Sequence, residues 1–421
     1  MATTRGAPQR DAATTAAPHP VVWLILYLPF GALGGFVQIA LTFLATQHGL
    51  SISEGALLNG AQLLSQWLKW LWAPLVDITL SPKRWYVIST SASALGVIAM
   101  AAMPMSPDTL GALLAVIAIA SLVNSVVGMA VESLIASSTT PDQVGRVSAW
   151  FQAGNMAGNG LGGGLGLFLM SRLPAPWMTG LVMAVLFMAC CLVLRFTVEA
   201  PHPPGQRALG AVKAVVSSLW EMLKTKGGLL SAILCVLPVG TGAAVVVLTQ
   251  SKVAAHWGAS AGHVALLQGL LAGIITAVGC FAGGWLCQRL PPRTAYMVIG
   301  MALAAVATAL ALAPATVTTY VIGSLVYSFF VGLAYAAFTA VVLVSMGPGA
   351  AATKYNVFAS LSNFPIWWVG LLLGFVADRF GPNAMLLGEA ALGVAGVAVF
   401  VLAAWLVNRS RLAASPVAIG P

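Results

Sequence analysis

Charged side chains are scarce in this chain, and their scarcity sets the first limit on its class. Only 7% of its 421 residues are Asp, Glu, Lys or Arg, whereas 59% are hydrophobic. Soluble domains contain about 25% charged residues, so this composition excludes an ordinary soluble protein. The sequence therefore predicts an integral membrane protein.

Nucleotide-binding and metal-binding motifs are absent as well. The chain contains no Gly-Lys dipeptide, and hence no phosphate-binding G-x-x-x-x-G-K-[ST] loop, so we do not expect direct use of ATP. Its 5 histidines and 5 cysteines follow no metal-ligand spacing. We predict no cofactor, no metal site and no enzymatic activity.

Apolar runs long enough to cross a bilayer recur along the whole chain. A spanning helix needs about 20 mainly apolar residues. We expect twelve such spans, at 21–46, 53–76, 85–104, 109–136, 146–170, 174–197, 228–250, 262–287, 294–313, 317–346, 354–376 and 382–407. The predicted fold class is an all-α integral membrane protein with twelve transmembrane helices.

Basic residues are distributed unevenly between the two sides of these spans. If both termini are cytoplasmic, fifteen of the 19 Lys and Arg residues lie in inner segments, and only Arg172, Lys252 and Arg379 lie in outer ones. Cytoplasmic loops are enriched in basic residues, so we predict a multi-pass cell (inner) membrane protein with both termini inside. The net charge of +9 then reflects orientation and contact with membrane lipids, not nucleic-acid binding.

The longest polar interval divides the spans six and six. The predicted parts are a disordered cytoplasmic tail at 1–20, a six-helix bundle at 21–198, a cytoplasmic linker at 199–227, a second six-helix bundle at 228–407 and a cytoplasmic tail at 408–421. Apolar residues recur at helical spacing from Leu209 to Leu223, beside several lysines. This pattern predicts an amphipathic helix on the inner membrane surface.

Short motifs relate the two halves to each other and to a known family. Asp77 is followed by Lys83 and Arg84 after the second span, and the segment Gly283–Arg293 repeats a small-residue turn and basic residues after the eighth. This duplication resembles the major facilitator superfamily. Residues Lys69–Asp77, KWLWAPLVD, are similar to the K-F-L-W-A-P-L-x-D signature of its muropeptide permease (AmpG) and acetyl-CoA transporter family.

The resemblance implies two pseudo-symmetric six-helix bundles that work by alternating access. It also implies import of a small polar or amphiphilic solute, such as a muropeptide, by a monomer. Siderophore permeases and drug or metabolite exporters of the same fold remain alternatives. An alternative of another class is a membrane scaffold or sensor that transports nothing.

One face of the second span is polar from end to end. At about 100° per residue, its polar residues fall within an arc of roughly 80°. These residues are Asn59, Gln62, Gln66, Lys69 and Asp77. The resemblance implies that this face meets a similar face of the eleventh span, which contains Asn363 and Trp367. Packing through small residues is the alternative.

Glycine recurs every third or fourth position in the fifth and eighth spans, from Gly154 to Gly166 and from Gly269 to Gly283. Such spacing lets helix backbones touch. The resemblance implies that these two spans pack together, at the seam opposite to that of spans two and eleven.

Polar side chains elsewhere in the spans are candidates for a solute cavity. They share amide or aromatic groups that can hydrogen-bond a polar, uncharged or mixed ligand. The candidates are Gln38, Asn124, Gln152, Asn155, Gln250, Gln268, Tyr327, Tyr335, Asn363 and Trp367. Hydrogen bonding within the helix packing is the alternative for each of them.

Two opposite charges, Lys69 and Glu132, lie inside predicted spans at similar depth. Charges inside spans are costly and usually mark a function. We predict that Glu132 carries a coupling proton and that its charge state depends on Lys69 and on the solute. A fixed structural ion pair is the alternative.

A second group of charges lies at the inner mouth. The resemblance implies that Asp77, Lys83, Arg84 and Arg146 form a gate there. Solvated surface charges are the alternative. Together these features predict a proton-coupled secondary transporter, because a scaffold or sensor has no use for charges buried inside its spans.

Overall fold

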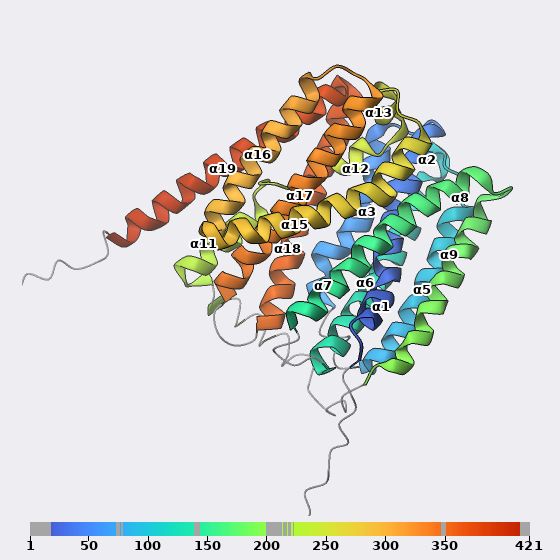
Figure 1. Cartoon of the computed structure of the whole chain (residues 1–421), viewed down its shortest axis with the longest axis horizontal. Coiled ribbons are helices and arrows are strands. Elements are labelled where there is room, and N and C mark those ends of the chain that lie inside the picture. The colour runs from blue at the N-terminus through green and yellow to red at the C-terminus, as the bar shows by residue number, and fades with distance from the viewer. Residues whose placement is uncertain are drawn as a thin grey trace, which may run out of the picture.

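The computed structural model places the helices of the first half beside those of the second. It describes residues 18–72, 76, 79–138, 144–198, 213, 217, 220, 221, 223–346 and 351–412. In Figure 1 the first half runs from blue to green and the second from yellow to red. Most of the predicted linker at 199–227, with its expected surface helix, lies outside the described residues.

The helices are continuous over most of each predicted span. The first half contains α1 (Val21–Gly35), η1 (Phe36–Leu41), α2 (Thr42–Gln47), α3 (Ile52–Leu68), η2 (Lys69–Leu71), α5 (Pro82–Ala102), η3 (Pro107–Thr109), α6 (Leu110–Ser138), α7 (Val144–Gly160), η4 (Leu161–Leu165), α8 (Gly166–Arg172), α9 (Pro176–Cys191) and η5 (Leu192–Phe196). The second half contains α11 (Lys226–Val236), α12 (Ala244–Leu248), α13 (Ser251–His256), α14 (Ala261–Leu266), η6 (Leu267–Leu271), α15 (Ala272–Arg289), α16 (Pro292–Leu312), α17 (Val317–Met346), α18 (Ala351–Phe380) and α19 (Pro382–Leu412).

Among the described residues, eight helical segments are long and apolar enough to cross a membrane. They are Val21–Gln47, Pro82–Ala102, Pro107–Ile135, Pro176–Phe196, Pro292–Leu312, Val317–Val342, Val357–Phe380 and Pro382–Val407. The other four predicted spans correspond to α3 with η2, α7 to α8, α11 with α12, and α14 to α15. The predicted all-α membrane fold is confirmed.

Local sequence signals explain several helix starts. At α3, the Ser51 Oγ accepts a hydrogen bond from the Glu54 N–H at 3.1 Å, and the Glu54 carboxylate accepts one from the Ser51 N–H at 2.7 Å. This capping box satisfies two amides that the helix itself leaves free. Pro82, Pro176 and Pro292 begin α5, α9 and α16, at a position where a helix needs no N–H donor.

Glycines bring helix backbones into contact within each half. A Cβ added at Gly162 would lie 1.8 Å from the Ala32 carbonyl oxygen, which places η4 directly against α1. In the second half, a Cβ at Gly279 would lie 2.1 Å from the Phe329 carbonyl oxygen, which places α15 against α17. The fifth and eighth spans do meet, as predicted, chiefly near η4 and η6. Most of their glycines, however, contact a helix of their own half and not the other span.

In the part of the chain that the structure describes, four spans are irregular near their middle. The π-helical turns η1, η4 and η6 interrupt three of them, and the seventh span is broken between α11 and α12. A break inside a membrane needs side chains to satisfy the freed backbone groups. Tyr296 Oη donates to the Val239 carbonyl oxygen at 2.5 Å, and the Ala244 N–H donates to Glu389 Oε1 at 3.2 Å. Glu389, only 6% exposed, therefore helps to hold this break.

Candidate transport site

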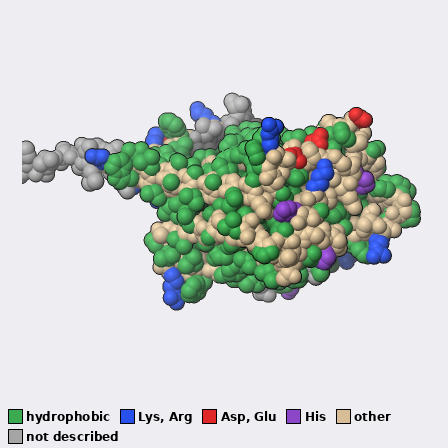
Figure 2. Space-filling model, turned by 90° about the horizontal axis from the view of Figure 1, so that it is seen from above, with side chains coloured by type: hydrophobic (Ala, Val, Ile, Leu, Met, Phe, Trp, Pro, Cys, Tyr) green, Lys and Arg blue, Asp and Glu red, His purple; other side chains and the backbone are tan. Residues whose placement is uncertain are grey.

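Hydrogen bonds between described residues of the two halves gather at one end of the molecule. Thr46 Oγ1 lies 2.9 Å from Ser251 Oγ, and Thr249 Oγ1 donates to the Gln38 carbonyl oxygen at 3.1 Å. The Asp378 carboxylate also accepts hydrogen bonds from the start of α3. We call this region, which comprises residues 46–53, 249–252 and 378, the closed end. It lies at the top of Figure 1, and Figure 2 looks onto it, where charged side chains are scattered among hydrophobic and neutral ones.

A seam between α3 and α18 begins at the closed end. The two helices pack against each other along much of their length, as the family resemblance implies. Gln38 Nε2 donates to Gln62 Oε1 at 3.2 Å, which joins η1 to the polar face of α3. Gln62 and Gln66 are buried, at 6% and 9% exposure. The polar face of the second span is therefore held inside the protein, away from lipid.

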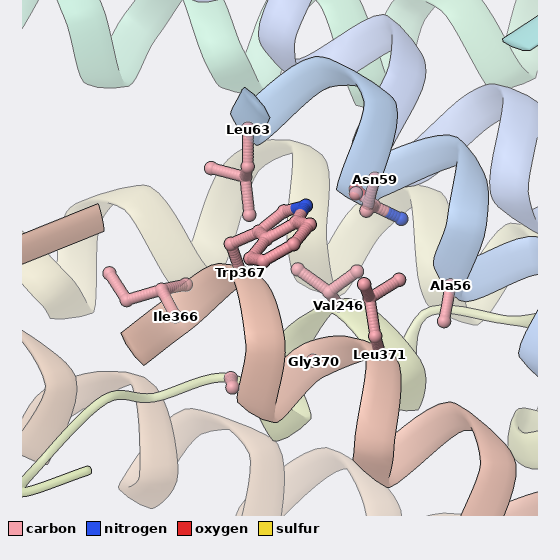
Figure 3. Close-up of a pocket in the computed structure, with 10 residues that line it drawn as sticks. Ala56, Asn59, Leu63, Val246, Ile366, Trp367, Gly370 and Leu371 are labelled. Carbon is pink, nitrogen blue, oxygen red and sulfur yellow. The ribbon is translucent and has the colours of Figure 1, made fainter. Parts of the chain in front are cut away.

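A small cavity lies in this seam (Figure 3). It is lined by Ala56, Asn59, Gly60, Leu63, Ala243, Val246, Ile366, Trp367, Gly370 and Leu371. Its volume is about 10 Å³, close to the roughly 10–15 Å³ that one water molecule requires. This cavity is thus too small for a solute larger than one water molecule.

Aromatic rings pack across the seam beyond this cavity. The ring centroid of Trp67 lies 5.4 Å from that of Phe364 and 5.8 Å from that of Trp367. These distances fall in the range of favourable aromatic pairs. Trp367, a predicted cavity residue, therefore contacts both the cavity and this aromatic cluster.

Lys69 and Glu132 lie together where α3 ends. Lys69 begins the turn η2, and its Nζ lies 3.8 Å from Glu132 Oε1 on α6. Their side chains are 15% and 27% exposed. Tyr27 Oη donates to the same carboxylate oxygen at 3.3 Å. The structure thus brings the two predicted charges together, while their role in proton coupling stays a prediction.

The turn that holds Lys69 is anchored to α6 by a second contact. Trp72 Nε1 donates to Ser125 Oγ at 2.9 Å. Ser125 and Glu132 are both on α6, seven residues apart and hence on nearly the same helix face. The contacts of Lys69 with Glu132 and of Trp72 with Ser125 therefore both depend on the position of α6.

Two of the four predicted gate residues have described side chains. Lys83 Nζ donates to the Thr197 carbonyl oxygen at 2.6 Å, a contact within the first half. Arg84 is exposed. Asp77 and the side chain of Arg146 lie outside the described residues. The gate therefore stays a prediction.

Four buried amides have atoms with no hydrogen-bond partner among the described residues. They are Asn59, Asn124, Gln250 and Gln268, at 3%, 2%, 0% and 6% exposure. Both amide atoms of Asn59 and Gln250 are unpaired, as are Oδ1 of Asn124 and Nε2 of Gln268. Buried polar atoms are rarely left unpaired, so these amides are the strongest candidates to contact a solute or water.

The remaining predicted cavity residues have partners or lie elsewhere. Three amides donate hydrogen bonds within their own half: Asn124 to the Phe30 carbonyl oxygen at 3.0 Å, Asn155 to Gln152 Oε1 at 3.4 Å, and Asn363 to the Ala359 carbonyl oxygen at 3.0 Å. Tyr335 is 49% exposed. Tyr327 Oη donates to Glu389 Oε2 at 2.5 Å, in the core between α17 and α19, so the structure does not place it in the seam cavity.

One short stretch, Gly258–Gly262, has the G-x-S-x-G spacing of hydrolase nucleophiles. Its serine is the N-cap of α14, where Ser260 Oγ accepts from the His263 N–H at 3.5 Å and lies 2.8 Å from His263 Nδ1. This arrangement is a capping box. Helix capping therefore accounts for both side chains.

Two charged residues at the closed end were not predicted to have a role. Lys252 and Asp378 both contact the first half. A signal existed in the sequence, because Asp378 lies in the last turn of a helix, where an acidic side chain is unfavourable for its own helix. Such a misplaced charge indicates a partner elsewhere.

Two helical halves that meet at a polar seam, with a charged pair inside the spans, define a multi-pass membrane transporter. The chain belongs to the Major Facilitator Superfamily, whose family model matches residues 23–368. It is 26% identical to the anhydromuropeptide permease of Escherichia coli (strain K12) over 364 residues, which cover 82% of this chain and 71% of that protein. The predicted resemblance to the muropeptide permease family is confirmed.

Solved structures share the fold. A bacterial homologue of the human lysosomal transporter Spinster, crystallised in an inward-facing and unoccupied conformation, matches with a TM-score of 0.69 and 14% identity, over 92% of this chain and 96% of that one. The nucleoside transporter NupG matches with a TM-score of 0.67 and 16% identity, over 91% of this chain and 98% of that one. These matches confirm the predicted major facilitator fold.

Proposed function

We propose that this chain is a secondary active transporter that imports a small polar or amphiphilic solute by alternating access, with the proton as coupling ion. The Lys69–Glu132 pair is the observation that carries this proposal. It lies where α3 ends, a full helix length away from the closed end, and both side chains retain some exposure. A titratable pair in that position can respond both to the aqueous phase and to the state of the seam.

Proton binding at Glu132 changes what holds η2 in place. A neutral Glu132 no longer attracts the Lys69 ammonium, and this attraction is stronger inside a protein than in bulk water. Lys69 is then free to bind an acceptor group of the solute. Because η2 follows α3 directly, release of Lys69 is transmitted to the α3–α18 seam.

We further propose an inward-facing orientation for this conformation. Basic residues are in excess in the predicted inner loops and tails. This excess supports an inner-membrane protein whose two termini lie in the cytoplasm. The closed end is then the outer end. Residues 21–198 and 228–407 act as the two moving bundles of a monomer in contact with lipid, and Asp77, Lys83, Arg84 and Arg146 act as the inner gate.

The chemistry of the seam favours a solute rich in hydroxyl and amide groups. Asn59 in the seam cavity and Gln250 at the closed end offer unpaired donors and acceptors, and Trp367 in the seam cavity offers an aromatic face. A relative is named as a permease for anhydromuropeptides, so a cell-wall fragment of that type is the first candidate. Its binding requires a wider seam than the conformation described above.

Uptake into proteoliposomes tests the cargo. We expect labelled anhydromuropeptide to accumulate when the interior is alkaline, with little uptake of a ferric siderophore or a lipophilic cationic drug. Protein-free liposomes are the control. Preference for the siderophore or the drug would favour those alternatives, and folded protein that moves none of the three would favour a scaffold or sensor.

A further inference from the structure

The turn between the first two spans presents opposite partial charges on its two sides. α2 ends at Gln47 and α3 begins at Ile52. The turn presents the carbonyl groups of Gly49 and Leu50, and the start of α3 leaves N–H groups free. Carbonyl oxygens carry partial negative charge, and the N–H groups at a helix start carry partial positive charge. The turn can therefore bind a cation on one side and an anion on the other.

The second half supplies both charges. Lys252 Nζ donates to the Gly49 carbonyl oxygen at 3.3 Å and also to the carbonyl oxygen of Leu50. The Asp378 carboxylate accepts hydrogen bonds from the N–H of Ile52 at 2.7 Å and of Ser53 at 2.5 Å. The first half contributes only backbone atoms to these four bonds.

The capping box of α3 leaves a place for Asp378. Ser51 and Glu54 satisfy each other's amides, whereas the amides of Ile52 and Ser53 point to the second half. A carboxylate is the stronger type of acceptor for such amides, because a charged partner shortens and strengthens the hydrogen bond. The start of α3 is thus capped partly from its own half and partly from the other.

Both charges are unfavourably placed in their own helices. Asp378 is in the last turn of α18, and Lys252 is in the first turn of α13. Each would be better placed at the opposite end of its helix. Each is favourably placed with respect to the turn between α2 and α3. The contact between the two halves, and not the stability of its own helix, therefore explains the position of each charge.

From this geometry we propose that Lys252 and Asp378 form a charge-to-backbone latch that holds the closed end together and sets the balance between the two conformations of the transporter. The proposal rests on alternating access but not on the cargo or the coupling ion. Both side chains are exposed, so solvent weakens the latch. Its loss is expected to shift the ratio of the two conformations about threefold to tenfold.

Hydrogen–deuterium exchange in proteoliposomes without solute tests the latch. We expect Asp378→Asn and Lys252→Met to raise exchange threefold to tenfold in residues 244–256, at the closed end. Exchange in residues 126–138, near Glu132, is expected to fall. In alternating access, the end of the protein near Glu132 closes when the closed end opens. Loss of local hydrogen bonds alone would not change the distant segment.

Two comparisons control the experiment. Arg379→Gln removes an exposed charge next to Asp378 and should leave both segments unchanged. In the native chain, high salt should reproduce the pattern of the latch variants in weaker form, because exposed charges are screened. A rise at both ends, or a rise confined to residues 48–53, would overturn the proposal. These exchange measurements contain no solute, so they leave the proposed transport function to the separate uptake experiment.

Discussion

Replacement of Glu132 by glutamine is expected to abolish proton-driven accumulation while solute exchange continues. Glutamine preserves the shape of the side chain and an acceptor oxygen for Tyr27, but it cannot bind and release a proton. With one coupled proton, a gradient of one pH unit supports about tenfold accumulation of the solute. The Glu132→Gln protein should therefore let the solute only reach the same concentration inside and outside the proteoliposomes. The measurement is solute uptake into proteoliposomes with an alkaline interior.

Counterflow separates this effect from loss of folding. Exchange of labelled solute for unlabelled solute requires binding and movement of the two halves but no net proton transfer, so it should survive in Glu132→Gln. Glu221→Gln is the matched control, because that carboxylate is 70% exposed and pairs only with the nearby Lys224 in the structure described. Full gradient-driven accumulation by Glu132→Gln would remove Glu132 from the coupling mechanism.

Replacement of Gly162 by alanine is expected to have the largest effect on stability. The added Cβ would lie 1.8 Å from the Ala32 carbonyl oxygen, a distance that forces η4 and α1 apart. Overpacking usually lowers the free energy of unfolding by about 1–3 kcal/mol. A clash with backbone atoms costs an amount at or above the upper limit of this range. We expect a large loss of folded protein, measured by size-exclusion chromatography and thermal unfolding in detergent.

Gly284→Ala is the matched control for that substitution. A Cβ at Gly284 meets no atom within 4 Å, and alanine is favoured over glycine in a helix by about 1 kcal/mol. The same chemical change should therefore destabilise the protein at Gly162 and leave it unchanged or more stable at Gly284. Similar thermal stability for the two variants would contradict the close contact between α1 and η4.

Much of the fold follows from local physics. Long apolar runs predict spans because the bilayer has a fixed thickness, and helical periodicity places Asn59, Gln62 and Lys69 on one face. The meeting of Lys69 with Glu132 was predictable because charges at equal depth in a membrane seek each other. The family motif at Lys69–Asp77 added the arrangement of the halves.

Other features depend on contacts that no single span encodes. A glycine-rich face shows that a close helix neighbour exists, but not which helix it is, so the sequence did not show that most glycines of α7 face α1 and that Gly279 and Gly283 of α15 face α17. The break in the seventh span is held by Tyr296 and Glu389, which are far away in sequence. The unfavourable position of Asp378 in its own helix indicated a partner, but Lys252 and Asp378 bind backbone groups, and backbone acceptors and donors leave no residue-specific signal of where that partner lies.

The most direct test of the central claim is the movement of protons with the solute. Proteoliposomes that contain a trapped pH-sensitive dye can be exposed to anhydromuropeptide in the absence of any imposed gradient. Proton-coupled import predicts acidification of the interior that begins when the solute is added, and that is lost in Glu132→Gln. Solute uptake without any change of internal pH would contradict proton coupling through the Lys69–Glu132 pair.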